Sequence, residues 1–431
     1  MSLEYNNHLL VISIDALNSH DFDYIKQLPT LGSFIKDGSY IRNLFSIYPS
    51  LTYPCHTSIT TGTYPNKHGI ISNKKCQPKR YLNEEWYWYE KYIKVPTIFD
   101  YAMKKGYSCG TVLWPVMAGA KITYNVPEIW PVKLENFIKT FINNSTTNLL
   151  PQILKYGIHF TPPLQPSLDN FTGDLTNYII TNKKPNLLFV HFTELDYIRH
   201  KLGLYAKEGK EVLSRMDKRV ARIIDSTKKA GIYNETSFII LGDHGTNDYD
   251  YYICINSIFK KANLINTDKN NKITSWKAFC NSCGGSAQIF LRNKQDKSTL
   301  NKVYNILNNI YMDSNSCIKN MYTANEANKK FCLDGNFSFV VEAKDEYVFG
   351  NYICDELVVP RTKFPKHVAD HGYEPCHRNM RTMLLAKGMN INNSYLSKAY
   401  LVDIAPTLAK LLNISMQDVD GKCLNKIINV N

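Results

Sequence analysis

The chain has 431 residues, of which 44% are hydrophobic and 21% charged, a composition that fits a globular protein with a sizeable core and excludes a disordered or fibrous chain. At this length it holds two or three domains, or one large α/β domain with an insertion. The net charge of +13 favours anionic partners such as nucleotides. Because no long run of consecutive basic residues occurs, a lysine-rich solvated surface is favoured over a dedicated nucleic-acid surface.

Neither a membrane span nor a signal peptide is expected. No apolar run approaches the roughly 18 residues that a membrane span needs, and the first predicted strand begins at residue 9 with no signal peptide before it. The 11 cysteines are an odd number and are scattered, which argues against a disulfide framework. We therefore expect a cytoplasmic protein, with a trimmed export signal as the alternative.

The predicted elements alternate between strands and helices. The predicted strands are near-continuous apolar runs that end in a residue able to bind a ligand, over residues 9–15, 186–196 and 236–245. The predicted helices span, in chain order, residues 95–106, 214–231 and 404–414. This alternation is typical of a mostly parallel sheet with helices on both faces. We predict one α/β catalytic domain over residues 1–431.

A segment of different composition interrupts this alternation. Residues 248–365 are rich in Asn and Lys and contain two stretches typical of a mixed sheet, 286–293 and 337–350. We predict that residues 248–365 form a smaller subdomain inserted in the catalytic domain.

The polar residues at the ends of the predicted strands indicate a metal site. In an open α/β sheet, ligands bind outside the carboxyl ends of the strands, where these residues would meet. His200 follows Asp196 by four positions, so one turn of helix can direct both side chains at one ion. The candidate ligands form two sets, one of Asp15, Asp243 and His244, the other of Asp196, His200 and His371. Zinc prefers such mixed shells, and two ions about 4 Å apart stabilise phosphoryl transfer.

The stretch YPSLTYPCHTSITTGTYPNKHGIISN, residues 48–73, places Thr52 at the start of a predicted helix. Backbone N–H groups at a helix N-terminus attract anions, and a metal ion lowers the pKa of a threonine hydroxyl enough to make it a nucleophile. A threonine at this kind of position is more often a helix cap. The catalytic interpretation of Thr52 therefore depends on the metal ligands around it.

From residue 9 to about residue 425 the chain resembles the nucleotide pyrophosphatase/phosphodiesterase branch of the alkaline phosphatase superfamily. The family's motif runs Thr-Phe-Pro-Asn-His, then Thr-Gly-x-Tyr-Pro-x-x-His-Gly-Ile and Asn, and TYPCH…TGTYPNKHGIISN matches nearly all of it. The resemblance implies an alkaline-phosphatase-like fold with a smaller inserted subdomain. It implies that Thr52 is the nucleophile and a ligand of the first metal, and that Asn73 donates to a non-bridging phosphate oxygen. The two ligand sets would hold two divalent ions, zinc first and manganese as the alternative.

Two positions depart from the family's motif. Cys55 stands where Asn is common, and Tyr53 stands where Phe is usual. Tyr53 keeps an aromatic face, which in relatives packs on the substrate, and a tyrosine at the edge of the core is an equal alternative. Trp114 lies in a segment similar to one in bacterial members and would wall the pocket together with residues 86–90, although packing is the commoner role of such a cluster.

The resemblance implies hydrolysis of a phosphodiester or pyrophosphate bond in a small anionic or nucleotide substrate, through a phospho-threonine intermediate. The alternative is a phosphomonoesterase or a phosphonoacetate-hydrolase-like enzyme, but no Arg or Lys is identified that would hold a dianionic phosphate. A non-catalytic protein that binds metal or nucleic acid is the remaining alternative. The complete set of nucleophile, amide donor and ligands argues against it, so no stable nucleic-acid partner is expected.

The tripeptide Asp-His-Gly occurs twice, at 243–245 and at 370–372. In the first copy both Asp243 and His244 are predicted ligands of one metal. In the second copy only His371 is a predicted ligand, and of the other metal. Asp370 is expected to orient that imidazole or to lie on the surface.

Overall fold

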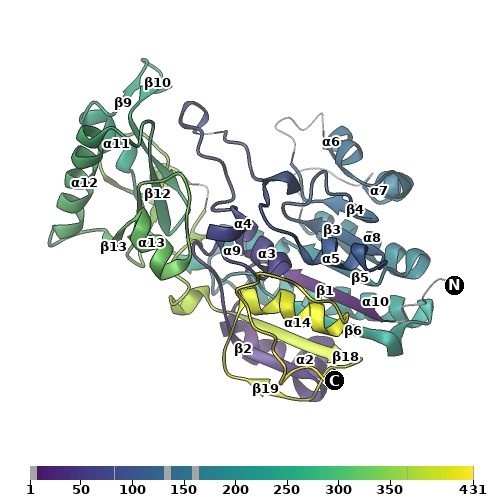
Figure 1. Ribbon diagram of the computed structural model, residues 1–431. Coiled ribbons are helices and arrows are strands. Elements are labelled where there is room, and N and C mark those ends of the chain that lie inside the picture. The colour runs from purple at the N-terminus through teal and green to yellow at the C-terminus, as the bar shows by residue number, and fades with distance from the viewer. Residues whose placement is uncertain (1–6, 82, 131–136, 158–164, 366, 431) are drawn as a thin grey trace.

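Figure 1 shows the chain as a computed structural model that describes residues 7–81, 83–130, 137–157, 165–365 and 367–430. The strands of its central sheet are β1 (His8–Ile14), β2 (Ser39–Phe45), β3 (Cys109–Trp114), β4 (Tyr124–Pro127), β5 (Leu187–Phe192), β6 (Thr236–Leu241), β18 (Thr382–Gly388), β19 (Tyr395–Leu396) and β20 (Ala399–Tyr400). They lie in the order β19-β2-β18-β6-β1-β5-β3-β4, with β20 also beside β2. β18 is antiparallel to both of its neighbours, and the other pairs are parallel. The predicted mostly parallel sheet is confirmed.

Helices cover both faces of this sheet, as predicted (Figure 1). One face packs against α2 (Pro29–Asp37), α8 (Ser167–Lys183) and α10 (Lys207–Ala230), and the other against α3 (Thr52–Thr61), α5 (Ile98–Lys104) and α14 (Ile404–Leu411). Successive strand side chains point to opposite faces, so Leu10 and Ile12 join the first core and Leu9 and Val11 join the second. A strand buried on both sides has to be apolar throughout, which explains the continuous apolar runs in the sequence.

The predicted helices are all present, but the strands predicted over 186–196 and 236–245 both end earlier than the sequence indicated, the second at Leu241, so that Asp243 and His244 follow the strand. The predicted strand over 186–196 is β5, which ends at Phe192, and Asp196 lies instead in the first turn of α9 (Glu194–Leu202). The cause is Asp169 of α8, whose carboxylate accepts the backbone N–H groups of Thr193 and Glu194, each at 3.0 Å. A carboxylate at that place satisfies the first N–H groups of the helix. Other short α-helices outside residues 248–365 are α1 (Phe22–Ile25), α4 (Pro65–His68), α6 (Phe137–Asn144) and α7 (Leu150–Gly157).

Residues 248–365 form smaller sheets and helices, gathered to one side of the central sheet in Figure 1. The strands are β8 (Tyr251–Ile253), β9 (Ile265–Thr267), β10 (Ile273–Trp276), β11 (Ala278–Ser282), β12 (Ser286–Leu291), β13 (Ile318–Thr323), β14 (Phe339–Ala343), β15 (Tyr347–Phe349) and β16 (Val358–Pro360), and the helices are α11 (Ile255–Lys261), α12 (Lys297–Met312) and α13 (Ala324–Phe331). The largest of these sheets is antiparallel, in the order β11-β12-β14-β13. The division of the chain at 248–365 stays a prediction.

The described part of the chain contains no helix that is both long and apolar enough to cross a bilayer. All 11 cysteines carry free thiols.

His68, at the end of α4, is a buried neutral imidazole away from the candidate ligands. Its Nδ1 accepts the Ile70 N–H at 3.1 Å, and its Nε2 lies 3.1 Å from the Ser58 hydroxyl, to which it donates. Burial lowers the pKa of His68 from 6.5 to about 3. Because the pKa is lower in the folded than in the unfolded chain, this histidine contributes stability that is present above about pH 6.5 and is lost as the pH falls toward 3.

We therefore predict that His68→Gln weakens the acid dependence of stability. Glutamine keeps one donor and one acceptor but does not titrate. In chelator-treated protein, the free energy of unfolding measured with urea at a series of pH values should fall less steeply below pH 6.5 for the variant than for the natural chain. Parallel curves for the two proteins would contradict this account of His68.

Candidate metal centre and active site

The candidate ligands gather at the carboxyl ends of three neighbouring strands. Asp15 directly follows β1, and Asp243 and His244 follow β6, which pairs with β1 on one side. β5 pairs with β1 on the other side and leads into α9, which carries Asp196 and His200 one turn apart. The sheet therefore brings together residues that are far apart in the sequence.

The first group consists of Asp15, Asp243 and His244, each of which offers a ligand atom within 4.8 Å of the others. His244 Nε2 lies 3.4 Å from Asp15 Oδ1 and 3.2 Å from Asp243 Oδ2. The other oxygen of Asp243, Oδ1, accepts the Ala16 N–H at 3.1 Å, which leaves Oδ2 facing the group. All three ligand side chains are buried.

The second group consists of Asp196, His200 and His371. Asp196 Oδ1 lies 3.4 Å from His200 Nε2 and 3.9 Å from His371 Nε2. The rings of His371 and His244 stack with their centroids 3.9 Å apart, so the two groups adjoin. A further group consists of His200, His367 and Asp370, and its His200 also belongs to the second group.

Each ligand histidine is anchored through Nδ1. The partners are backbone carbonyl oxygens: Gly245 for His244 at 3.0 Å, Ala369 for His200 at 2.7 Å, and Ser50 for His371 at 3.1 Å. A carbonyl oxygen only accepts, so Nδ1 carries the hydrogen and the lone pair of Nε2 faces the group. This tautomer and orientation are what a metal-bound histidine requires.

Each aspartate of the two groups has one buried oxygen without a hydrogen-bond partner. Asp15 Oδ1, Asp196 Oδ1 and Asp243 Oδ2 are buried without a hydrogen bond. Burial, together with the nearby Asp243 and Asp196 charges, raises the pKa of Asp15 well above its usual range. Burial also raises the pKa of Asp243 to about 6 and lowers that of His244 to about 4. A divalent cation would supply the missing charge and partners, so these residues fit a metal ion.

Thr52 is the first residue of α3 and lies beside the first group. Its Oγ1 is 3.1 Å from His244 Nε2. Leu51, which precedes the helix, makes no side-chain cap. Asn73 supplies a capping interaction instead, because its Oδ1 accepts the Tyr53 N–H at 2.9 Å. The Asn73 amide is thereby held next to Thr52, with its NH₂ group as the end able to donate to an anion at the helix N-terminus.

Tyr53 and Trp114, the predicted substrate contacts, occupy in this structure the packing positions that the sequence left as their alternative. Both side chains are fully buried. The Tyr53 ring packs against half-buried Trp86, with the centroids 5.3 Å apart. The Trp114 ring contacts His56 and Phe189, each at 4.7 Å between centroids. Tyr53 belongs to α3, and Trp114 packs against the same helix through His56.

Two buried histidines beside the first group escaped sequence reasoning. His56 Nδ1 donates to the Thr52 carbonyl oxygen at 2.7 Å, and His191 Nε2 donates to Asp15 Oδ2 at 3.1 Å. Burial acts to lower the pKa of His191, but its contacts with Asp15 and Glu128 outweigh burial and hold that pKa well above the usual value. For His191, the signal in the sequence was a histidine inside the apolar run LLFVHF. The sequence does not indicate which residues it contacts.

The two Asp-His-Gly tripeptides lie side by side. Strand β7 (Asn247–Asp248), which follows the first copy, pairs antiparallel with β17 (Ala369–Asp370), which ends at the aspartate of the second copy. Asp370 Oδ1 accepts the N–H of His371 at 2.9 Å, so this aspartate orients the backbone of a candidate ligand. Each glycine is required by a close backbone: a Cβ on Gly245 would lie 1.8 Å from the Asn379 carbonyl oxygen, and one on Gly372 would lie 1.7 Å from that of Cys283.

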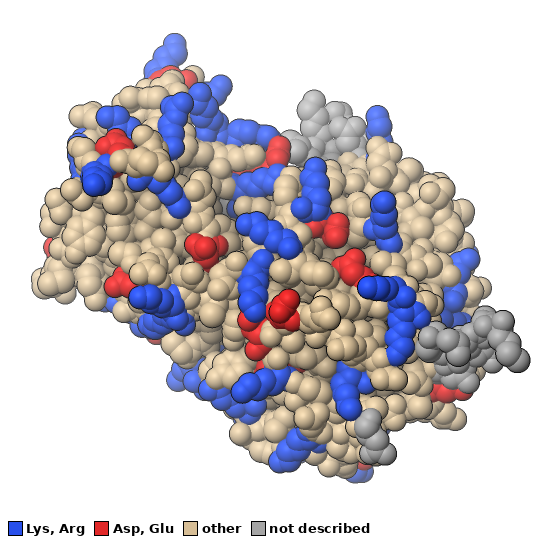
Figure 2. All heavy atoms as spheres, viewed as in Figure 1, with Lys and Arg blue, Asp and Glu red and all other residues tan. Residues whose placement is uncertain are grey.

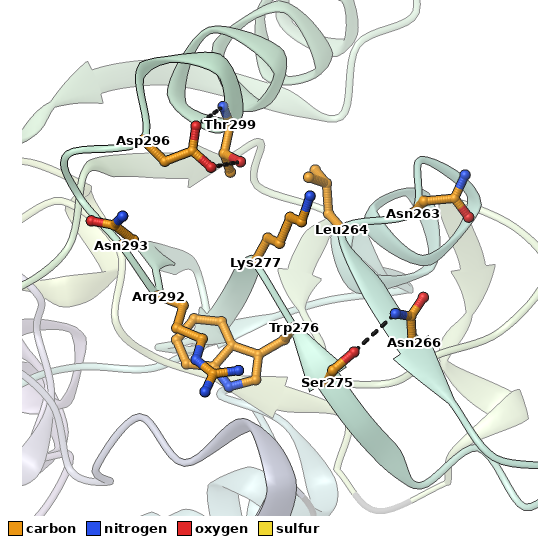
Figure 3. Close-up of a pocket in the computed structure, with 10 residues that line it drawn as sticks. All are labelled: Asn263, Leu264, Asn266, Ser275, Trp276, Lys277, Arg292, Asn293, Asp296 and Thr299. Carbon is orange, nitrogen blue, oxygen red and sulfur yellow. Dashed lines mark hydrogen bonds between the residues drawn. The ribbon is translucent and has the colours of Figure 1, made fainter.

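A cavity of about 390 Å³ lies within residues 248–365 and not at the ligand groups. Figure 3 shows Lys277 and Arg292 with Trp276 along it. None of the candidate ligands lines it, and Asp296 is occupied by its hydrogen bonds to Thr299. The cavity is therefore separate from the candidate ligand groups.

The fold and the two groups define an α/β protein of the alkaline phosphatase type, with carboxylate–histidine ligand sets beside a threonine at a helix N-terminus. The chain belongs to the type I phosphodiesterase/nucleotide pyrophosphatase family, whose model matches residues 9–374.

Relatives of known name agree with this assignment. The chain is 22% identical to human bis(5'-adenosyl)-triphosphatase ENPP4 over 451 residues, which covers 96% of this chain and 81% of the relative. It is 28% identical to human ectonucleotide pyrophosphatase/phosphodiesterase family member 1 over 230 residues, which covers 51% of this chain but only 21% of that longer relative. Among solved structures, murine ectonucleotide pyrophosphatase/phosphodiesterase 5 has the same fold, with a TM-score of 0.70 at 18% identity, covering 98% of this chain and 100% of that one.

The geometry predicts different effects for the two aspartates of the Asp-His-Gly copies. Asp243→Asn removes a buried ligand charge and should lower the bound metal, measured by elemental analysis of dialysed protein, by one equivalent. Asp370→Asn keeps an oxygen that accepts the His371 N–H and should retain the metal, with affinity weakened by about tenfold or less. Equal metal loss in the two variants would contradict the ligand assignment.

Proposed function

We propose that this protein hydrolyses phosphodiester or pyrophosphate bonds in small nucleotide-like substrates, with Thr52 as nucleophile and with two divalent metal ions. Zinc is the first candidate for these ions. The observation that carries the proposal is the position of Thr52. Its Oγ1 lies 3.1 Å from His244 Nε2, at the start of a ten-residue helix and beside buried carboxylate oxygens that lack partners.

The residues divide the reaction between them. Thr52 Oγ1 attacks phosphorus in line with the departing oxygen, and the product is a phospho-threonine plus the released alcohol or phosphate. Asn73 donates to a non-bridging oxygen as negative charge develops there. Water then cleaves the phosphorus–oxygen bond of the phospho-threonine and regenerates Thr52. Bound divalent ions would lower the pKa of the Thr52 hydroxyl and neutralise charge on the departing oxygen.

The names of relatives support a nucleotide substrate. Human ENPP4 is named as a bis(5'-adenosyl)-triphosphatase. The structure of murine ectonucleotide pyrophosphatase/phosphodiesterase 5 holds AMP in an inactive threonine-to-alanine variant. For this chain, a substrate with a nucleotide on one side of the bond that breaks is therefore proposed.

The lysines beside Asn73 favour a diester over a monoester. Lys75 Nζ lies 3.2 Å from Glu85 and donates to the Tyr92 hydroxyl at 2.5 Å, so its charge is committed. Lys74 Nζ lies 3.6 Å from buried Glu84. A dianionic monoester needs a free cation near its terminal oxygens, and neither lysine is placed as one.

The nucleic-acid alternative finds no support on the face shown in Figure 2. There, Lys and Arg are scattered and interspersed with Asp and Glu instead of forming a continuous basic stripe. Binding to a polyanion depends on a clustered positive surface, so the net charge of +13 does not by itself indicate one.

We predict that Thr52→Ala lowers kcat/KM for a chromogenic nucleotide phosphodiester on the order of 10³-fold or more, because it removes the attacking oxygen. Thr176→Ala is the matched control, since the Thr176 hydroxyl is buried in α8 and donates to the Thr172 carbonyl oxygen at 2.7 Å. The control should keep the activity of the natural chain. An active Thr52→Ala protein would rule out the threonine mechanism.

A second prediction concerns substrate class. Metal-loaded protein should hydrolyse a p-nitrophenyl nucleotide diester with a higher kcat/KM than p-nitrophenyl phosphate or phosphonoacetate, because Lys74 and Lys75 are both paired with glutamates and not free for a dianion. Release of p-nitrophenol and of inorganic phosphate measures the three rates. A preference for the monoester or the phosphonate would favour the corresponding alternative enzyme.

A further inference from the structure

A row of buried polar contacts crosses the edge of the central sheet, from Asp15 to the residue that follows the nucleophile. It runs through His191 on β5 and Glu128, which directly follows β4, and ends at Tyr53. We call these four residues the His191 chain. The strand order β1-β5-β3-β4 places its members side by side.

His191 gives the two carboxylate oxygens of Asp15 different environments. Its Nε2 donates to Asp15 Oδ2 at 3.1 Å, whereas Asp15 Oδ1 has no hydrogen bond and lies 3.4 Å from His244 Nε2 in the first ligand group. An aspartate can rotate about its terminal bond, so a fixed donor on one oxygen decides which oxygen faces the metal position. His191 is fully buried and has no access to solvent of its own.

Glu128 lies on the other side of the His191 ring and also contacts Tyr53 in α3, the helix that begins with Thr52. His191 Nδ1 lies 3.2 Å from Glu128 Oε2 and 3.2 Å from its hydrogen-bond partner, the Leu113 carbonyl oxygen. Glu128 Oε1 accepts from the Tyr53 hydroxyl at 3.3 Å and from Trp130 Nε1 at 3.0 Å. Tyr53 is the neighbour of Thr52 in the first turn of α3. The His191 chain thus joins a candidate metal ligand to the helix that carries the nucleophile.

We propose that His191 and Glu128 are positioning residues, which fix Asp15 Oδ1 toward the first metal ion and hold the start of α3 at a constant distance from it. This inference rests on the proposed function only in taking the first ligand group as a metal site. Neither residue belongs to the two ligand sets, and neither contacts the metal position directly.

A purely structural role predicts a different result. Charged groups buried in a core are often no better for stability than neutral ones of the same size, so stability alone does not explain the placement of His191 between two carboxylates. A positioning role predicts a loss confined to the metal next to Asp15. A structural role predicts lower stability with both metal sites equally affected.

The experiment is a calorimetric titration of chelator-treated protein with Zn²⁺. His191→Gln should weaken one of the two Kd values by about 10- to 100-fold and leave the other unchanged, and kcat/KM should recover as zinc is raised. His68→Gln is the matched control, because His68 is also a fully buried histidine, and its ring makes hydrogen bonds with Ser58 and Ile70, neither of which is a candidate ligand. Both Kd values of the control should equal those of the natural chain.

A second variant keeps the test decisive if His191→Gln does not fold. Glu128→Gln retains an acceptor for Tyr53 and Trp130 but loses the charge next to His191, and it should weaken the same zinc site by a smaller factor. Unchanged Kd values, or equal weakening of both sites, would overturn the proposal. The zinc titration does not depend on hydrolysis, so a protein that binds zinc normally yet cleaves no phosphodiester would refute the proposed function and leave this inference standing.

Discussion

Three aspartates, each with one oxygen buried without a hydrogen-bond partner, impose the constraint on which the site depends. Asp15, Asp196 and Asp243 each direct such an oxygen at the same small region. Bringing like charges together in a medium of low polarity is costly, and proteins resolve it by protonation or by a bound cation. Because the surrounding histidines are anchored through Nδ1 with Nε2 facing inward, the cation is the solution that this arrangement favours.

Much of the fold could be predicted because burial on both faces leaves a clear record in the sequence. β1, β5 and β6 are mostly apolar and end next to polar residues, so both the parallel sheet and the meeting of Asp15 with Asp243 follow from pattern alone. The start of α9 did not follow, because the residue that caps it, Asp169, belongs to a different helix.

The site was predictable to the extent that its chemistry is local in sequence. Asp196 and His200 share one helix turn, and Thr52 and Asn73 belong to one motif. The contacts of His191 with Glu128 depend on the order of strands, which no single segment encodes. For Tyr53 and Trp114 the sequence left a substrate contact and core packing as alternatives, and their complete burial favours packing.

The pairing of β7 with β17 has a consequence for how this family can vary. Ala369 pairs with Asp248, so the long stretch between them leaves and re-enters the catalytic framework at neighbouring positions. His244 and His371, which lie close in sequence to these two strands, stack with their ring centroids 3.9 Å apart. Because the two ends of this stretch are paired, a change in the length of its outer loops would alter the surroundings of the site and leave the spacing of Asp248 and Ala369 in place.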